Sequence, residues 1–174
     1  MDIQKNKDLI DFNSFGIKAT ADYYVEVTSE HEIEAALDFV YAEKVPYLIL
    51  GGGSNILFVN NFHGMIIHIK NKGIFWDSSL DNQKQRVDVS AGENWHNFVV
   101  LCLSKNLHGL ENLALIPGTI GGAPIQNIGA YGVEVKDLIE SVKVFDLMRK
   151  KWLMLSNQDC GFGYRNSILR TSNR

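Results

Sequence analysis

The chain has 174 residues, of which 45% are hydrophobic, so it can bury a core as one domain or as two small lobes. Its formal net charge of −3 offers no basic surface, and we therefore expect no nucleic-acid partner. Cys102 and Cys160 are too few for a disulfide framework, and the five histidines are scattered without metal-ligand spacing, so we expect a reduced, cytoplasmic protein without a metal site.

The N-terminal part begins with polar residues, which give no support for a secretory leader. Residues 23–27 have strand composition, and Ser29 with Glu32 predicts a capping box. The capping box begins a helix that we expect from Glu30 to Lys44, before Pro46. The apolar residues of this helix share one face: Ile33, Ala36, Leu37 and Val40.

A strand expected at residues 47–50 runs into the sequence GGGSN, residues 51–55. This loop is not a Rossmann fingerprint, because the sixth position from Gly51 is Ile56, and it has no lysine for a Walker A loop. Ser54 is also a poor nucleophile candidate, since Ile56 replaces the second glycine of a nucleophile elbow. Two interpretations remain: an ordinary tight turn, or a loop whose backbone N–H groups converge on an anion.

Another β-rich stretch follows at residues 64–69, so this part predicts a β-α-β lobe with the glycine loop at a strand's carboxyl end. The polar stretch from Asp77 to Arg86 predicts a surface hairpin or a lobe boundary. Residues 86–92 alternate like a strand, and a helix capped by Asn94 is expected to run through Lys105 and to be closed by Gly109.

Six of the fifteen glycines lie in the 24 residues from Gly109 to Gly132, a density that lets backbone approach a flat ligand closely. Within this stretch, the apolar run from Leu113 to Ile125 contains two prolines and is too short to span a membrane, so we expect no membrane partner. We interpret it as a buried or ligand-lining loop. Beyond it, IESVKVFDL and KWLMLSN predict an antiparallel pair of strands.

Four motifs in this order resemble the UDP-N-acetylenolpyruvoylglucosamine reductases (MurB) of peptidoglycan synthesis, which contain FAD: LGGGSNILF, AGENWHNFV, GLENLALIPGTIGGAPIQNIGAYG and CGFGYRNS. The resemblance extends from about Asp22 to Ile168. It implies an α+β fold, a two-lobed FAD-binding domain of the vanillyl-alcohol-oxidase/p-cresol-methylhydroxylase type. The lobes are expected at residues 1–75 and 76–174, the second with a mainly antiparallel sheet, and FAD between them.

The resemblance also implies the chemistry. In this family NADPH reduces the flavin, which then passes hydride to UDP-N-acetylglucosamine enolpyruvate and yields UDP-N-acetylmuramate for the cell wall, and so for cell shape and division. Arg165 matches the family's catalytic arginine, whose planar fork suits the developing charge on a carboxylate, and Tyr164 is expected to contact the substrate. Without the family context, such a pair predicts only a solvated strand end. A monomer is expected, with the nucleotide sugar and NADPH as its small-molecule partners.

The cofactor-binding residues implied by the resemblance come from two motifs. Residues 51–55 match the pyrophosphate loop, and a side chain at Gly52 is expected to enter the space that the pyrophosphate needs. The complete set expected around FAD is Gly51, Gly52, Gly53, Ser54, Asn55, Pro117, Gly118, Gly121, Gly122, Ala123, Gln126, Asn127 and Gly129. Trp95 and Tyr131 are interpreted as core aromatics, and Glu93 and Glu111 as structural residues at helix starts.

The family's enzymes continue past the GYR motif into a substrate-binding lobe, which supplies a proton-donating serine and a glutamate that have no counterpart here. We therefore expect a deliberately truncated chain, a prematurely stopped gene product or a split protein. Three functions stay open: the flavoenzyme reductase, a catalytically incomplete FAD-binding module, and a structural domain without a nucleotide.

Overall fold

The computed structural model describes residues 1–77 and 85–171. Contacts within the chain group it into two compact units, Met1–Asn94 with Pro117–Ile120 and Trp95–Ile116 with Gly121–Arg174. Residue 75, where we expect the first lobe to end, lies within the first unit, in which the backbone amide of Gly92 also bonds to the carbonyl of Asn71 at 3.2 Å. The division into lobes at residues 75 and 76 stays a prediction.

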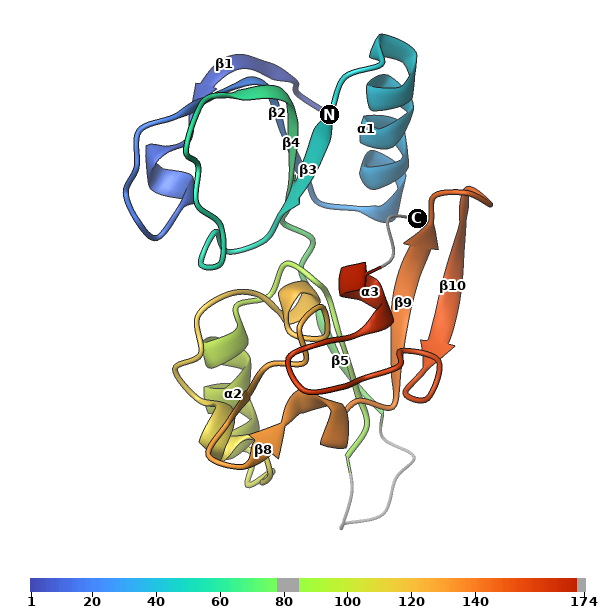
Figure 1. Ribbon diagram of the computed structural model, residues 1–174. Helices are drawn as coiled ribbons and strands as arrows, with labels where there is room; N and C mark the ends of the chain where they lie inside the picture. The colour runs from blue at the N-terminus through green and yellow to red at the C-terminus, as the bar shows by residue number, and fades with distance from the viewer. Residues whose placement is uncertain (78–84, 172–174) are drawn as a thin grey trace. The chain divides into compact units, whose positions relative to one another are not determined.

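A four-stranded sheet forms the centre of the first unit, with the strand order β1-β2-β4-β3 (Figure 1). Strands β2 and β3 both pair in parallel with β4, whereas β1 pairs antiparallel with β2. The strands are β1 (Gln4–Asp8), β2 (Thr20–Val27), β3 (Tyr47–Leu50) and β4 (Phe62–Ile69). The expected β-α-β arrangement is present, with β4 inserted between the two strands that the helix connects.

Helix α1 (Glu30–Glu43) covers one face of this sheet and begins with a modified form of the expected cap. The Ser29 hydroxyl accepts a hydrogen bond from the amide of Glu32 at 3.2 Å. The Glu32 carboxylate, however, accepts from the amide and hydroxyl of Thr28 at 2.7 and 2.8 Å, and not from Ser29 as a capping box requires. The helix ends at Glu43, and the C-cap residue Lys44 has a left-handed backbone with φ 55°.

The two faces of the sheet bury different residues, as the period of two along a strand requires. On one side α1 contacts β2 and β4 and buries Ala36, Leu37 and Val40. On the other side Tyr24, Leu50 and Ile66 form a core cluster with further residues of the sheet and of the segments that flank it. These additional residues are Leu9, Ala19, Ala21 and Phe58, with Phe12, Leu48, Ile56 and Phe62 packed against them. The second cluster therefore lies under the chain that carries the glycine loop.

The first unit also contains an antiparallel pair, β5 (Ile74–Trp76) with β6 (Val87–Val89). The amide of Asp77 bonds to the carbonyl of Arg86 at 3.1 Å and continues this pair. Most of the polar stretch expected to be a hairpin or a boundary, residues 78–84, lies outside the described residues.

The second unit begins with helix α2 (Trp95–Ser104). The expected stop at Gly109 is wrong, because the chain already leaves the helix at Asn106, whose φ is 58°. The amides of Asn106 and Leu107 bond to carbonyls of the last helical turn at 3.0 Å, which is a C-terminal cap of the left-handed type. Asparagine tolerates this conformation better than most residues, and it serves here in place of glycine.

The remaining elements of the second unit are short. Two antiparallel pairs are present in its described residues, β7 (Gly129–Ala130) with β8 (Val133–Glu134), and β9 (Ser141–Asp146) with β10 (Lys151–Ser156). The β9–β10 hairpin confirms the expected antiparallel pair. Short 3-10 turns lie at Ile10–Phe12, Glu111–Leu113, Ile120–Gly122 and Val135–Asp137, and α3 spans Ile168–Thr171. No helix in the described part of the chain is both long enough and apolar enough to cross a membrane.

Candidate functional site

The glycine loop, residues 51–55, leaves the carboxyl end of β3 and packs against residues 117–119 of the same unit. A Cβ atom added to Gly51 would lie 2.7 Å from the Thr119 hydroxyl oxygen. A Cβ atom on Gly52 would lie 2.9 Å from the Cα atom of Gly118. Two segments far apart in the sequence therefore form one structure, and they approach this closely because glycine has no side chain.

The expected role of Gly52 at the pyrophosphate stays a prediction, and this contact gives the position a separate need for glycine. A side chain at Gly52 would meet the backbone of Gly118, with or without a pyrophosphate. Position 53 also requires glycine, since its φ is 69° and a Cβ atom there would overlap the carbonyl of Phe12. The loop is also held at this point by the amide of Ser14, which donates to the Gly53 carbonyl at 3.0 Å.

The same packing leaves hydrogen-bond donors available at the loop. Within residues 1–77 and 85–171, the backbone amides of residues 51–54 donate no hydrogen bond to the protein. In that part of the chain the hydroxyls of Ser54 and Thr119 also lack a protein partner, whereas Asn55 has one. Ser54 Oγ lies 3.3 Å from the position of a Cβ atom on Gly118, so the two hydroxyls belong to the same contact between loops. Amides and hydroxyls gathered in this way suit an oxyanion.

Sequence reasoning missed Thr119, which follows the Pro117 and Gly118 pair that we expected at the cofactor. Thr119 forms an isolated antiparallel bridge with Asn94, and the neighbouring Ile120 amide donates to the Glu93 carbonyl at 2.9 Å. This pairing fixes residues 117–120 in the first unit. The proximity of Thr119 to Gly51 arises through tertiary contact, and no local pattern in the sequence signals it.

The predicted residues from Gly121 onward lie in the second unit, where Asn127 is fully buried. Its Nδ2 donates to the carbonyl of Gly163 at 2.9 Å, and its Oδ1 accepts from the amide of Lys136 at 3.1 Å. Its backbone is left-handed, with φ 46°. The expected polar contact of Asn127 with the flavin stays a prediction, but its side-chain amide already joins three segments of the protein.

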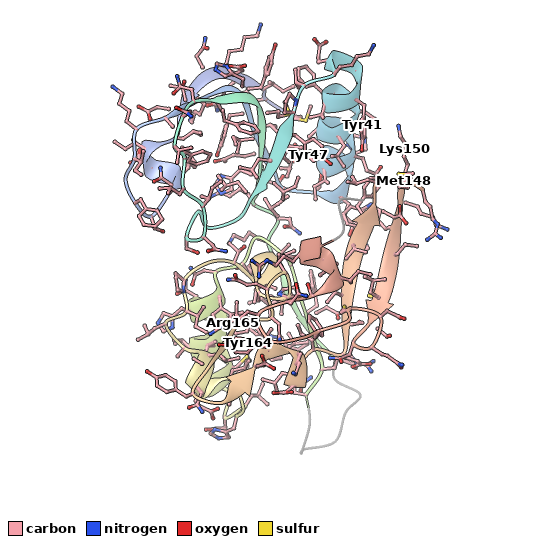
Figure 2. All side chains as sticks on the ribbon, in the orientation of Figure 1. Tyr41, Tyr47, Met148, Lys150, Tyr164 and Arg165 are labelled. Carbon is pink, nitrogen blue, oxygen red and sulfur yellow. The ribbon has the colours of Figure 1, made fainter. Side chains whose placement is uncertain are left out.

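Tyr164 and Arg165 form the two-residue turn between Gly163 and Asn166, which bond to each other through both amides at 3.0 and 3.1 Å. Both residues are labelled in Figure 2 and both are exposed, Tyr164 to 86%. Arg165 has φ 50°, and its Nη2 donates to the carbonyl of Gly129 at 2.5 Å. The structure thus brings Arg165 together with Gly129, another predicted site residue.

The other predicted residues of the second unit lie within residues 121–129. Ala123 and Gly129 are buried, Gly122 is exposed, and Gly121 and Gln126 are half-buried. The hydroxyl of Ser167 donates to the carbonyl of Ile125 at 2.7 Å. This bond adds a third connection between the CGFGYRNS motif and residues 125–129.

The expected core aromatics have different outcomes. Trp95 is buried, and its indole N–H donates to the carbonyl of Leu113 at 2.7 Å, which confirms its structural role. Tyr131 is 89% exposed, so its assignment to the core is wrong. It occupies the β7–β8 turn with Gly132, and both have positive φ, 50° and 81°, as in a type I′ hairpin. A residue at the tip of a two-residue turn points away from the strands it connects.

The two glutamates make structural contacts, as expected. Glu93 accepts from the amide of Gly73 at 2.9 Å and lies 3.3 Å from the Lys72 ammonium. Glu111 accepts from the amide of Gly109 at 2.6 Å, and backbone hydrogen bonds lower the pKa of its carboxyl. Cys102 and Cys160 are unpaired and buried, and burial raises the pKa of both thiols.

Comparisons with known proteins place these features in context. Residues 21–149 match the FAD binding domain family. The UDP-N-acetylenolpyruvoylglucosamine reductase of Shewanella sp. (strain ANA-3) is 47% identical over 163 residues, 94% of this chain and 47% of that protein. The reductase of the same name from Amoebophilus asiaticus (strain 5a2) is 44% identical over 172 residues, 99% of this chain and 50% of that protein. The chain spans about half the length of these curated relatives.

Two solved structures are also similar to this chain. The crystal structure of UDP-N-acetylenolpyruvylglucosamine reductase (MurB) from Thermus caldophilus has a TM-score of 0.72 at 26% identity, covering 95% of this chain and 56% of that one. A VAO-type flavoprotein from Myceliophthora thermophila C1 has a TM-score of 0.57 at 14% identity, covering 77% of this chain and 26% of that one. Together these findings confirm the predicted α+β fold of the vanillyl-alcohol-oxidase type and the resemblance that the four motifs predict.

Proposed function

The chain belongs to the FAD binding domain family, and on this basis we propose that it binds FAD with the pyrophosphate at residues 51–55. One observation carries the proposal. The amides of residues 51–54 and the hydroxyls of Ser54 and Thr119 have no protein partner among the described residues, although the packing of residues 117–119 holds them in place. Polar groups that are fixed and unbonded at the end of a parallel strand suit a diphosphate.

The activity that we propose for the whole protein is the NADPH-dependent reduction of UDP-N-acetylglucosamine enolpyruvate to UDP-N-acetylmuramate. Its support is the similarity to the UDP-N-acetylenolpyruvoylglucosamine reductases over 94% of this chain. When bound, FAD supplies the hydride transfer between NADPH and the enolpyruvyl group. Residues 121–129, with Gln126 and Asn127, form the backbone wall beside the flavin in this proposal.

Arg165 is the residue that we propose to stabilise charge on the substrate carboxylate. Its guanidinium is held by the Gly129 carbonyl through Nη2, which leaves further N–H groups for a ligand. Arginine stays charged at all working pH values and meets a carboxylate with two parallel hydrogen bonds. Tyr164 beside it is exposed and free to contact the substrate in the same proposal.

A second candidate function for these residues is FAD binding without the complete reaction. The specific observation in its favour is that the family matched by residues 21–149 is described by its binding of FAD alone. Flavin reduction by NADPH needs only the nicotinamide half-reaction, whereas product formation needs the serine donor and the glutamate that the family carries in its substrate-binding lobe. Measuring the two half-reactions separately distinguishes the candidates. A monomer in the cytoplasm, with the nucleotide sugar and NADPH as partners, completes the proposal.

Flavin binding is tested by titrating the purified chain with FAD and with riboflavin, which has no pyrophosphate, and following flavin fluorescence. We expect FAD to bind and riboflavin to bind far more weakly. Ser54→Ala is expected to weaken FAD binding, because it removes one hydroxyl donor from the loop. Ser14→Ala is the matched control, since Ser14 holds Gly53 through its backbone amide, which the substitution keeps. Equal affinity for FAD and riboflavin would show that the loop does not bind the pyrophosphate.

A further inference from the structure

His68 is a buried titratable residue beside the glycine loop that the proposed function does not use. It lies on β4, where its register partners are Glu26 on β2 and Leu50 on β3. Leu50 is the last residue before the loop, so His68 is at the position where the sheet meets Gly51. The residue is 8% exposed, and the Phe12 ring packs edge-on against the imidazole at 5.6 Å.

A chain of hydrogen bonds passes through this histidine. Tyr24 Oη lies 2.7 Å from His68 Nδ1 and 2.8 Å from Glu26 Oε1. The imidazole also hydrogen-bonds to the backbone of Gly51, and this bond raises the pKa of His68, as expected for a ring N–H that donates to a carbonyl. The network therefore connects a half-exposed carboxylate on β2 with the first residue of the glycine loop.

The number of protons in this network depends on the charge of His68. Burial raises the pKa of Tyr24, and the nearby Glu26 raises it further, so the phenol keeps its single proton. If the phenol donates to Glu26, then His68 must donate from Nδ1 to Tyr24 and also from its other nitrogen to Gly51. A neutral imidazole carries one N–H and can make only one of these two bonds. The imidazolium makes all of them.

The surroundings of His68 oppose this protonation in the free protein. Burial lowers the pKa of His68, and the Lys70 ammonium lowers it further, whereas Glu26 and the Gly51 backbone act in the opposite direction. From β1, the Lys7 ammonium lies 5.0 Å from the centre of the Tyr24 ring and adds positive charge to the same region. Near pH 7 the free protein therefore holds His68 neutral, with one bond of the network unmade.

We propose that His68 is a positioning residue for the glycine loop. His68 becomes charged when an anionic diphosphate binds at residues 51–54, and it then holds Gly51 through the completed network. The inference rests on the proposed binding of FAD. Two negative charges at the loop offset the cost of a buried imidazolium, so binding the diphosphate favours the protonated state. By linkage the effect is reciprocal, and protonation of His68 strengthens FAD binding.

The expected signature is a pH dependence of FAD affinity. The pyrophosphate of FAD has no group that titrates near neutral pH, so the ligand keeps its charge through this range. Uptake of one proton on binding tightens FAD up to about tenfold for each pH unit, between the pKa of His68 in the free and in the bound protein. Affinity is then expected to rise as the pH falls from about 8 to 5.5.

The test measures FAD dissociation constants by flavin fluorescence across this pH range for the chain and two variants. In His68→Gln the side chain cannot titrate, and we expect the pH dependence to flatten. His63→Gln is the matched control, because His63 lies on the same strand but is exposed, 3.4 Å from Asp22, and its loss is expected to leave the slope unchanged. As a readout that requires no variant, the NMR titration of the His68 ring should shift to higher pH when FAD is added.

The outcomes are distinguishable. An equal pH slope in the chain and in His68→Gln, or a His68 titration that FAD does not move, overturns the inference while the proposed function stands. A chain that binds no FAD at any pH overturns both. If His68→Gln does not fold, the ring titration of the unaltered chain decides.

Discussion

The side chain of Asn127 and the backbone of Gly163 connect the two glycine-rich motifs of the second unit, through a bond of 2.9 Å from Nδ2 to the Gly163 carbonyl. A second bond joins the same two motifs, because Arg165 Nη2 donates to the carbonyl of Gly129. The turn that presents Tyr164 and Arg165 is therefore positioned by residues 36 places earlier in the chain. A site residue on an exposed turn needs such support, because the turn alone does not fix the direction of a long side chain.

Asn127→Ala is expected to lower the free energy of unfolding by about 2 to 3 kcal/mol, because it removes two part-buried hydrogen bonds and leaves the Lys136 amide without its acceptor. Urea denaturation measures the change. Asn106→Ala is the matched control, since Asn106 shares the left-handed backbone but is exposed, so it should cost about 1 kcal/mol or less. Equal losses in the two variants would mean that backbone conformation, and not the buried amide, accounts for the effect.

Gly52→Ala is expected to destabilise the protein by about 1 to 3 kcal/mol even without flavin, because the new Cβ atom would lie 2.9 Å from the Gly118 Cα atom. Gly163→Ala provides the comparison. A Cβ atom there would meet only the Cβ atom of Asn166 at 4.0 Å, so a change within about 0.5 kcal/mol is expected. Thermal melts of the flavin-free proteins check both values. A stable Gly52→Ala variant that loses only flavin binding would instead support the pyrophosphate as the group that needs the space.

The stability of the flavin-free protein should depend on His68 below about pH 6.5, the ordinary pKa of histidine. Burial lowers the pKa of His68 in the folded state, so the unfolded chain binds more protons in the range between the two pKa values. Stability therefore falls as the pH falls through this range, and it is regained as the pH rises above it.

The measurement compares the free energy of unfolding of the chain and of His68→Gln between about pH 7.5 and 5. As the pH falls, the free energy of unfolding of the chain should decrease more than that of His68→Gln. His63→Gln again provides the control for an exposed histidine on the same strand. Parallel curves for the chain and His68→Gln would contradict the lowered pKa.

Arg165→Ala is expected to slow substrate reduction by about 3 kcal/mol of activation free energy, the scale for removing one donor from a developing oxyanion. Arg165→Lys should recover little, because an ammonium cannot reproduce the bidentate fork. Stopped-flow measurement of both half-reactions, in a chain extended to the length of its relatives, gives the values. Reduction of the flavin by NADPH should be unchanged.

Arg149→Ala, at an exposed arginine that pairs with Asp146 in the β9–β10 turn, is the control for loss of a positive charge. If flavin reduction collapses in Arg165→Ala while substrate reduction does not, then Arg165 acts on the nicotinamide or on the fold. In that case its proposed contact with the substrate is wrong.

Local patterns in the sequence predicted the elements in which apolar side chains alternate along a strand or recur at helical spacing. The apolar face of α1, its stop before Pro46 and the β9–β10 pair follow from periodicity and turn chemistry. Strand β1 was not predicted, because its residues Gln4–Asp8 are polar and exposed, and it becomes a strand by pairing with the edge of β2. Tyr131 was misassigned to the core for a related reason, since an aromatic residue is buried only when the backbone directs its side chain into the core.

The sequence by itself determined that residues 51–55 are a glycine loop at a strand end and that four motifs stand in the order of a flavoenzyme family. Only the tertiary structure decided what the loop contacts. The approach of Gly118 and Thr119 to Gly51 and Gly52, and the bond between Tyr24 and His68, join residues that are between 40 and 70 places apart. Such contacts depend on strand order and register, which a local pattern of residues does not specify.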